Sequence, residues 1–108
     1  MSKIKLPLLN WLVSEENGHY ATNIYSGSVG TDPEKGCLGT RTFNYRAYVK
    51  IVGEKKKHLF LIVIAFIIGP WVGGCEVTDY ECKMFKCTER GKRKAEKWLS
   101  NKSEKYGF

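Results

Sequence analysis

The sequence has little of what enzymes use for acid, base or nucleophilic chemistry. Its 108 residues include only two histidines, His19 and His58, and neither lies beside a Ser or Cys in a setting typical of an activated nucleophile. No two carboxylates are spaced so that they share one face of a rigid element, as a paired general acid and base would. We therefore expect a protein that is not an enzyme.

The sequence also lacks an apolar run long enough to cross a bilayer. Residues 59–68 are continuously apolar, but Gly69 and Pro70 interrupt the run, and a membrane-spanning helix needs about 20 apolar residues. The N-terminal stretch carries two lysines before its apolar residues, yet Pro7 breaks it and no cleavage site of small residues follows. We expect a cytoplasmic protein with no membrane attachment.

The sequence lacks a cysteine spacing typical of a metal site. The last three cysteines follow the pattern Cys-x6-Cys-x4-Cys, which does not match the ligand spacing of zinc sites. Without an export signal we do not expect disulfides either. The sequence therefore predicts free, buried thiols, no metal and no cofactor; the cysteines are Cys37, Cys75, Cys82 and Cys87.

Basic residues are in clear excess. Eighteen Lys and Arg against eleven Asp and Glu give a net charge of +7. Residues 31–60 hold seven basic and three acidic residues, and residues 78–108 hold nine basic and five acidic, so each segment contributes +4. Such asymmetry favours contact with nucleic acid or an acidic surface.

Two strands are predicted in the middle of the chain. Residues 41–52 alternate, with Phe43, Tyr45, Ala47, Val49 and Ile51 facing the core. After a turn at residues 53–57, the apolar run at 59–68 is typical of a strand covered on both faces and pairs back antiparallel. We expect Gly69-Pro70 to end this strand.

The N-terminal third permits two interpretations. Asn17-Gly18 is a strong hairpin signal between residues 8–14 and 19–26. Alternatively, residues 7–15 form a short helix with Pro7 at its first position. Residues 27–40 form a glycine-containing loop, a candidate binding element because of its length.

A capping box predicts where the C-terminal helix begins. Thr78 and Glu81 have the Thr-x-x-Glu spacing, so we expect a helix over about 79–102, with fraying at 103–108. An apolar stripe at helical spacing should lie on the sheet: Tyr80, Met84, Cys87, Gly91, Ala95 and Trp98. The predicted fold is a single α+β domain, residues 1–108, in which one long C-terminal α-helix packs on one face of an antiparallel meander of three to four strands.

One short segment resembles a known family. Residues 91–99, Gly-Lys-Arg-Lys-Ala-Glu-Lys-Trp-Leu, resemble the basic start of the final helix in double-stranded-RNA-binding domains, and residues 43–53 are similar to the second strand of those domains. The match covers under a fifth of the chain. In that family the basic motif begins the helix almost directly after the third strand, whereas here about 20 residues separate it from the last predicted strand.

These features predict a small non-enzymatic binding protein. A single helix covers one sheet face only, so we expect the other face to be open and to hold part of the site. The protein would dock through a basic helix and this face onto nucleic acid or a nucleic-acid-handling complex. The candidate contact residues are Arg46, Tyr48, Lys50, Lys55, Lys56, Lys57, Lys92, Arg93, Lys94 and Lys97.

Two further partner hypotheses concern proteins. The chain could be an inhibitor or accessory protein of the kind encoded by phages and mobile elements, resembling anti-CRISPR proteins, which blocks a host nuclease effector without itself binding nucleic acid. The open sheet face could also bind a second copy of the chain as a homodimer, because large exposed apolar patches mark interfaces.

Overall fold

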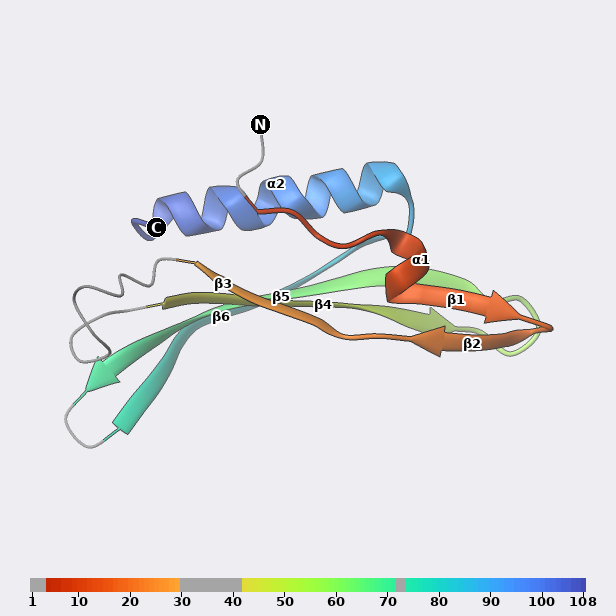
Figure 1. Cartoon of the computed structure of the whole chain (residues 1–108), viewed down its shortest axis with the longest axis horizontal. Helices are drawn as coiled ribbons and strands as arrows, with labels where there is room; N and C mark the ends of the chain where they lie inside the picture. Colours follow the sequence, from red (N-terminus) through yellow and green to blue (C-terminus); the bar gives the residue numbers. More distant parts are fainter. Residues whose placement is uncertain (1–3, 30–41, 72–73) are drawn as a thin grey trace.

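A computed structural model describes residues 4–29, 42–71 and 74–108, and Figure 1 shows a helix lying along one face of a sheet. Within these ranges no helix is long and apolar enough to span a bilayer. The elements in chain order are α1 (Leu9–Leu12), β1 (Val13–Glu16), β2 (His19–Thr22), β3 (Tyr25–Val29), β4 (Thr42–Val52), β5 (His58–Trp71), β6 (Gly74–Lys86) and α2 (Glu89–Lys105).

The main sheet is the predicted antiparallel meander. Its four strands follow the order β3-β4-β5-β6, and β1 and β2 form a separate two-stranded hairpin. The β4–β5 register runs from Thr42 opposite Ile68 to Val52 opposite His58. The α+β prediction, with the C-terminal helix on one sheet face, is confirmed.

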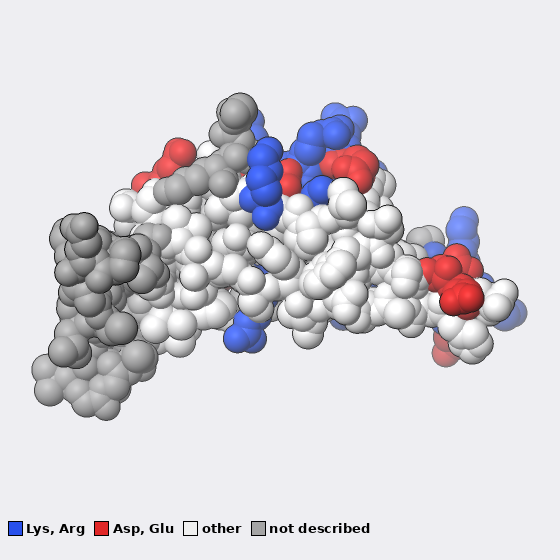
Figure 2. Space-filling view, viewed as in Figure 1, with Lys and Arg blue, Asp and Glu red and all other residues white. Residues whose placement is uncertain are grey.

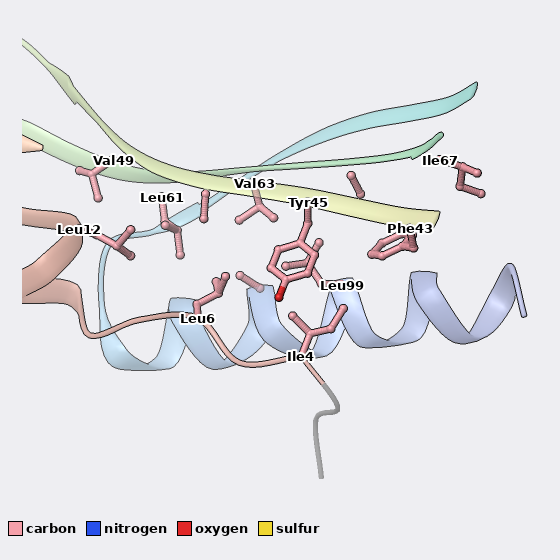
Figure 3. Packing of buried hydrophobic residues seen from close by; sticks show 13 residues of the cluster. Ile4, Leu6, Leu12, Phe43, Tyr45, Val49, Leu61, Val63, Ile67 and Leu99 are labelled. Atoms are coloured by element: carbon pink, nitrogen blue, oxygen red, sulfur yellow. The ribbon is translucent and has the colours of Figure 1, made fainter. Parts of the chain in front are cut away.

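The core lies between the sheet and α2. Phe43, Ala47 and Val49 of β4 are each no more than 4% exposed, as their alternation predicts. Side chains of β5 at the opposed positions also point toward α2, where Leu99 meets them (Figure 3). Gly91 and Ala95 lie on the same buried face of the helix.

The N-terminal segment is hydrogen-bonded to α2. The backbone N–H of Ile4 donates to Ser100 Oγ at 2.9 Å, and that of Leu6 donates to Glu96 Oε2 at 2.8 Å. The side chains of Ile4 and Leu6 are buried in the core. These contacts account for the buried Ser100 and for the carboxylate of Glu96, which needs a donor because it is only 6% exposed.

Both interpretations of the N-terminal third are partly correct. Residues 9–12 form the short helix α1 rather than a strand, and β1 follows directly. The hairpin turn is confirmed: Asn17 and Gly18 have positive φ angles of 52° and 81°, as a two-residue type I′ turn requires. The strand expected at 19–26 divides at residues 23–24, where the N–H of Asn23 donates to Leu12 O.

The predicted start of the long helix is wrong. Residues 78–86 belong to β6, which pairs with β5 from Trp71 opposite Gly74 to Phe60 opposite Lys86. The exposed polar groups of the long β5 edge require a partner strand, and that pairing outweighs the local capping signal at Thr78. The helix begins ten residues later, where Thr88 Oγ1 accepts the Gly91 N–H at 3.0 Å.

The apolar stripe is corrected in the same way. Tyr80 and Met84 are strand residues that are more than half exposed. On α2 the buried stripe is Gly91, Ala95, Leu99 and Ser103, so Leu99 rather than Trp98 continues it.

Three other boundaries differ from expectation. Gly69-Pro70 does not end β5, which continues to Trp71 and pairs with β6 over these residues. Residues 27–29 belong to β3, and the rest of the predicted 27–40 loop lies outside the described residues. The C-terminus does not fray, because Phe108 packs on Phe43 with ring centroids 6.2 Å apart.

Candidate functional site

The basic residues converge at the junction of β6 and α2. A hollow of about 480 Å³ lies between the end of the strand and the first turns of the helix. We call it the basic hollow. It is lined by Lys83, Met84, Phe85, Lys86, Thr88, Arg90, Gly91 and Lys94.

The local geometry follows from two residues. Thr88 caps the helix, so that α2 begins two residues after the end of β6. Gly91 is buried against the backbone carbonyl of Lys86, where a Cβ would collide. The absence of a side chain at Gly91 lets the helix pass close to the strand and brings Arg90 and Lys94 beside Lys83 and Lys86.

The charge in the basic hollow is of one sign. Four of its lining residues are basic, and none of the described lining residues is acidic. The N-terminal end of α2 adds the positive end of the helix dipole. A concave surface with one sign of charge concentrates counter-ions of the other sign, so the basic hollow suits an anion such as a phosphate group.

Aromatic side chains hold two neighbouring lysines. The ammonium of Lys83 lies over the rings of Phe85, at 5.5 Å, and Trp98, at 6.0 Å. Lys102 is 5.8 Å from the centre of Trp98 and pairs with Glu81 Oε2 at 2.5 Å. The hydrogen bond that the Lys102 ammonium donates to Glu81 raises the pKa of Lys102, and the two charges of this pair offset each other.

The predicted helix residues divide among three positions. Lys94 lines the basic hollow. Arg93 and Lys97 are exposed on the outer face of α2, where Figure 2 shows Lys and Arg side chains gathered over the helix layer. Lys92 is half-buried and lies one turn before Glu96, on the side that the N-terminal segment covers.

The predicted lysines at 55–57 lie apart from the helix. They are exposed in the turn between β4 and β5, at the end of the sheet nearer the start of α2 (Figure 1). Lys57 Nζ donates to Gly53 O at 2.7 Å, so this ammonium is directed back onto its own turn.

The remaining candidates lie on the sheet face opposite α2. We call this the open sheet face, because no element of the described chain covers it (Figure 1). Among exposed side chains, Val77, Tyr80 and Met84 are 56%, 61% and 57% exposed. The face carries Asn44, Arg46, Tyr48 and Lys50 from β4, Phe60, Ile62, Ile64, Phe66 and Ile68 from β5, and Val77, Tyr80, Cys82, Met84 and Lys86 from β6.

No described element lies over the second face of β5, but neighbouring side chains on that face leave Ile62 only 7% exposed. The structure brings Arg46, Tyr48 and Lys50 together on this face, as alternate residues of β4. Cys82 is exposed here, whereas burial was expected, and Cys87 is half-buried. Cys37, and the side chain of Cys75, lie outside the described residues.

Sequence reasoning missed three residues of the basic hollow as site residues: Lys83, Lys86 and Arg90. The two lysines were assigned to a helix, which hid their convergence with Arg90 and Lys94. The local signal was short: polar and apolar residues alternate from Glu81 to Met84, and Thr88 follows as a second capping residue.

The corrected helix start also changes the comparison with double-stranded-RNA-binding domains. Lys92, Arg93 and Lys94 lie in the first two turns of α2, and the preceding strand ends at Lys86. The separation of about 20 residues is therefore wrong, and the basic motif does follow the last strand closely. Comparison of the chain with protein families, curated proteins and solved structures found no match.

Proposed function

We propose that this protein binds nucleic acid through the phosphate backbone, as a binding protein rather than an enzyme. One observation carries the proposal: Lys83, Lys86, Arg90 and Lys94 line a single hollow in which no described lining residue is acidic. Phosphates are the anions that lysine and arginine clusters bind most often in macromolecules, and their neutralisation releases counter-ions.

The outer face of α2 extends this surface. Arg93 and Lys97 are exposed one helical turn apart, and Arg90, Lys94 and Lys97 follow at spacings of four and three, which places them along one side of the helix. A strand seated in the basic hollow would therefore meet further cations along α2. The protein would act in the cytoplasm, where the exposed thiol of Cys82 stays reduced.

The test is the salt dependence of binding. Fluorescence anisotropy with labelled single- and double-stranded DNA and RNA gives the affinity between 50 and 200 mM salt. If four phosphates are neutralised, the slope of log affinity against log salt is about −3.6 on duplex DNA and about −2.8 on a single strand, which on the duplex is a loss of roughly 150-fold over that range.

Matched double variants assign the contact to the basic hollow. Lys86→Gln/Lys94→Gln should make the slope shallower by about 1.4 to 1.8 and weaken binding. Lys5→Gln/Lys105→Gln removes the same charge from exposed lysines outside the hollow and should leave the salt slope and the affinity nearly unchanged. Equal effects of the two double variants would show that only net charge matters, and the proposed site would be wrong.

The protein-directed hypothesis has its own support. Val77, Tyr80 and Met84 are apolar or aromatic side chains that the fold leaves more than half exposed, as at protein interfaces. As an inhibitor of a host nuclease effector, the chain would bind no labelled nucleic acid, and would form a stable complex that is lost on substitution in the open sheet face.

A further inference from the structure

The open sheet face contains a hollow of its own. Its volume is about 400 Å³, which is within the size range of small-ligand sites. We call it the sheet hollow, and it shares no lining residue with the basic hollow. The side chains that concern its chemistry are Ser26, Asn44, Arg46, Phe66, Ile68 and Tyr80.

Two aromatic rings form one wall of the sheet hollow. The rings of Phe66 and Tyr80 are stacked, with centroids 6.3 Å apart and planes inclined by 26°. A β-bulge sets up this pair: between Ala65 and Ile67 the register of β6 shifts, and Asp79 takes a positive φ of 54°. Two β6 residues therefore oppose Phe66, and Tyr80 is left 61% exposed beside it.

The polar groups complement a flat heterocycle that carries a phosphate. The guanidinium of Arg46 lies 5.7 Å from the centre of the Phe66 ring, where it can bind an anion next to a stacked base. The amide nitrogen of Asn44 donates to Thr42 O and Oγ1 at 3.1 and 3.0 Å, so Asn44 offers a ligand its carbonyl oxygen. Ser26 adds a hydroxyl that can donate or accept.

We propose that the sheet hollow binds a nucleobase, stacked on Tyr80 and Phe66, with the adjoining phosphate against Arg46. The base belongs either to a single-stranded nucleic acid or to a free nucleotide. For the strand the inference rests on the proposed function, and it specifies that the nucleic acid is single-stranded, because bases in a duplex are stacked on both sides and cannot present a face to an aromatic ring.

The charge of the surface favours this occupant over an apolar protein segment. The open sheet face carries Arg46, Lys50 and Lys86, whereas Glu81 points to the helix side, where it pairs with Lys102. Asp79 precedes Tyr80 in the bulge, and none of the described residues that line the sheet hollow is acidic. An apolar partner would leave these cations unpaired as water is removed, whereas a strand of nucleic acid supplies a phosphate beside each base.

The experiment compares Tyr80→Leu with Ile24→Leu. Both residues have exposed apolar or aromatic side chains. Tyr80 lines the sheet hollow, whereas Ile24 lines neither hollow. Affinities are measured by anisotropy for a single strand, the same strand with abasic sites, and a duplex. Loss of one stacked base weakens binding by about 5- to 150-fold.

The expected result has four parts. Tyr80→Leu weakens binding of the single strand by that factor without changing its salt slope, and Ile24→Leu has little effect. Wild type binds the abasic strand about as weakly as Tyr80→Leu binds the intact strand. Tyr80→Leu does not further weaken binding of the abasic strand. Duplex affinity is unchanged by Tyr80→Leu. Arg46→Gln makes the single-strand slope shallower by about 0.7.

The outcomes separate the two proposals. Salt-dependent binding with equal affinity for intact and abasic strands would overturn the base site and leave the proposed function standing. Binding of a mononucleotide that needs Tyr80, with no binding of any strand, would support a free-nucleotide site and refute the proposed function. If no nucleic acid or nucleotide binds and a protein partner alone is captured through Tyr80, both proposals fail.

Discussion

Replacing Gly91 by alanine tests whether the strand-to-helix junction is as tight as the structure shows. Gly91 is the third residue of α2 and is buried. An added Cβ would collide with the backbone carbonyl of Lys86. A flexible side chain could move away, but this carbonyl belongs to the last residue of β6, so relief requires the strand end or the helix to shift.

The magnitude follows from two opposed effects. In a helix interior, alanine is more favourable than glycine by about 1 kcal/mol. Forcing extra atoms into a packed site usually costs about 1–3 kcal/mol, and the upper part of this range applies because backbone is the obstacle. We therefore expect Gly91→Ala to lower the free energy of unfolding by about 1–2 kcal/mol, which corresponds to a fall in Tm of roughly 5–10 °C for a domain of this size.

Urea and thermal unfolding followed by far-UV circular dichroism measure the effect. Asn101→Ala is the matched control, because Asn101 is exposed within the same helix. Alanine there gains helix propensity without a collision and should raise stability by a few tenths of a kcal/mol. Equal or greater stability of Gly91→Ala than wild type would refute the close approach of α2 to β6.

Two further predictions concern stability. Thr88→Ala should lower the free energy of unfolding by about 1 kcal/mol, because the Gly91 N–H loses its acceptor. Thr88→Ser keeps a hydroxyl acceptor and should retain most of the wild-type stability. Urea denaturation measures both variants. Burial, then the charge and hydrogen bond of Tyr25, raise the pKa of Tyr45 to about 12, so the fold favours the neutral phenol. The stabilisation that this pKa shift provides is complete below pH 10 and is lost as pH rises toward 12. Between pH 9 and 11, Tyr45→Phe should therefore lose less stability than wild type. If the difference in stability between the two proteins does not change with pH over this range, the pKa shift is contradicted.

The strands at the centre of the sheet could be predicted because two signals agree there. In β4, alternate apolar residues specify which face is buried, and in β5 a continuous apolar run indicates a central strand. Neither inference depends on distant contacts. The turn at Asn17-Gly18 is equally local, because few other residues tolerate positive φ at both positions.

The start of α2 could not be read in the same way. Thr78 and Thr88 are both followed by residues that suit a helix, and Thr78 has the stronger local signal, with Glu81 three residues later. The choice is made by β5, which pairs with residues 74–86 along its whole length. A short-range pattern contains no information about this pairing, so tertiary structure overrides it.

The same error limited the prediction of the site. Lys94 was recognised as part of a basic helix, but its convergence with Lys83 and Lys86 depends on the strand that precedes the helix. Likewise, Arg46 and Tyr48 were placed correctly on an open face, whereas the stacking of Phe66 on Tyr80 arises from the bulge at Asp79, which the sequence does not reveal.

The open sheet face is not required by the stability of the fold. Apolar side chains stabilise a protein by roughly 25 cal/mol per Å² removed from water, and Val77, Tyr80 and Met84 each leave more than half of their surface exposed. Polar β-formers such as threonine would pair equally well with β5 at these positions and would reduce the risk of aggregation along the exposed edge strand β6. The exposure of these side chains therefore supports the proposal that the open sheet face binds a partner. Because β6 carries Tyr80 near its middle and Lys86 at its end, six residues or about 20 Å apart along a strand, one unpaired nucleic-acid strand lying along β6 would meet both the sheet hollow and the basic hollow.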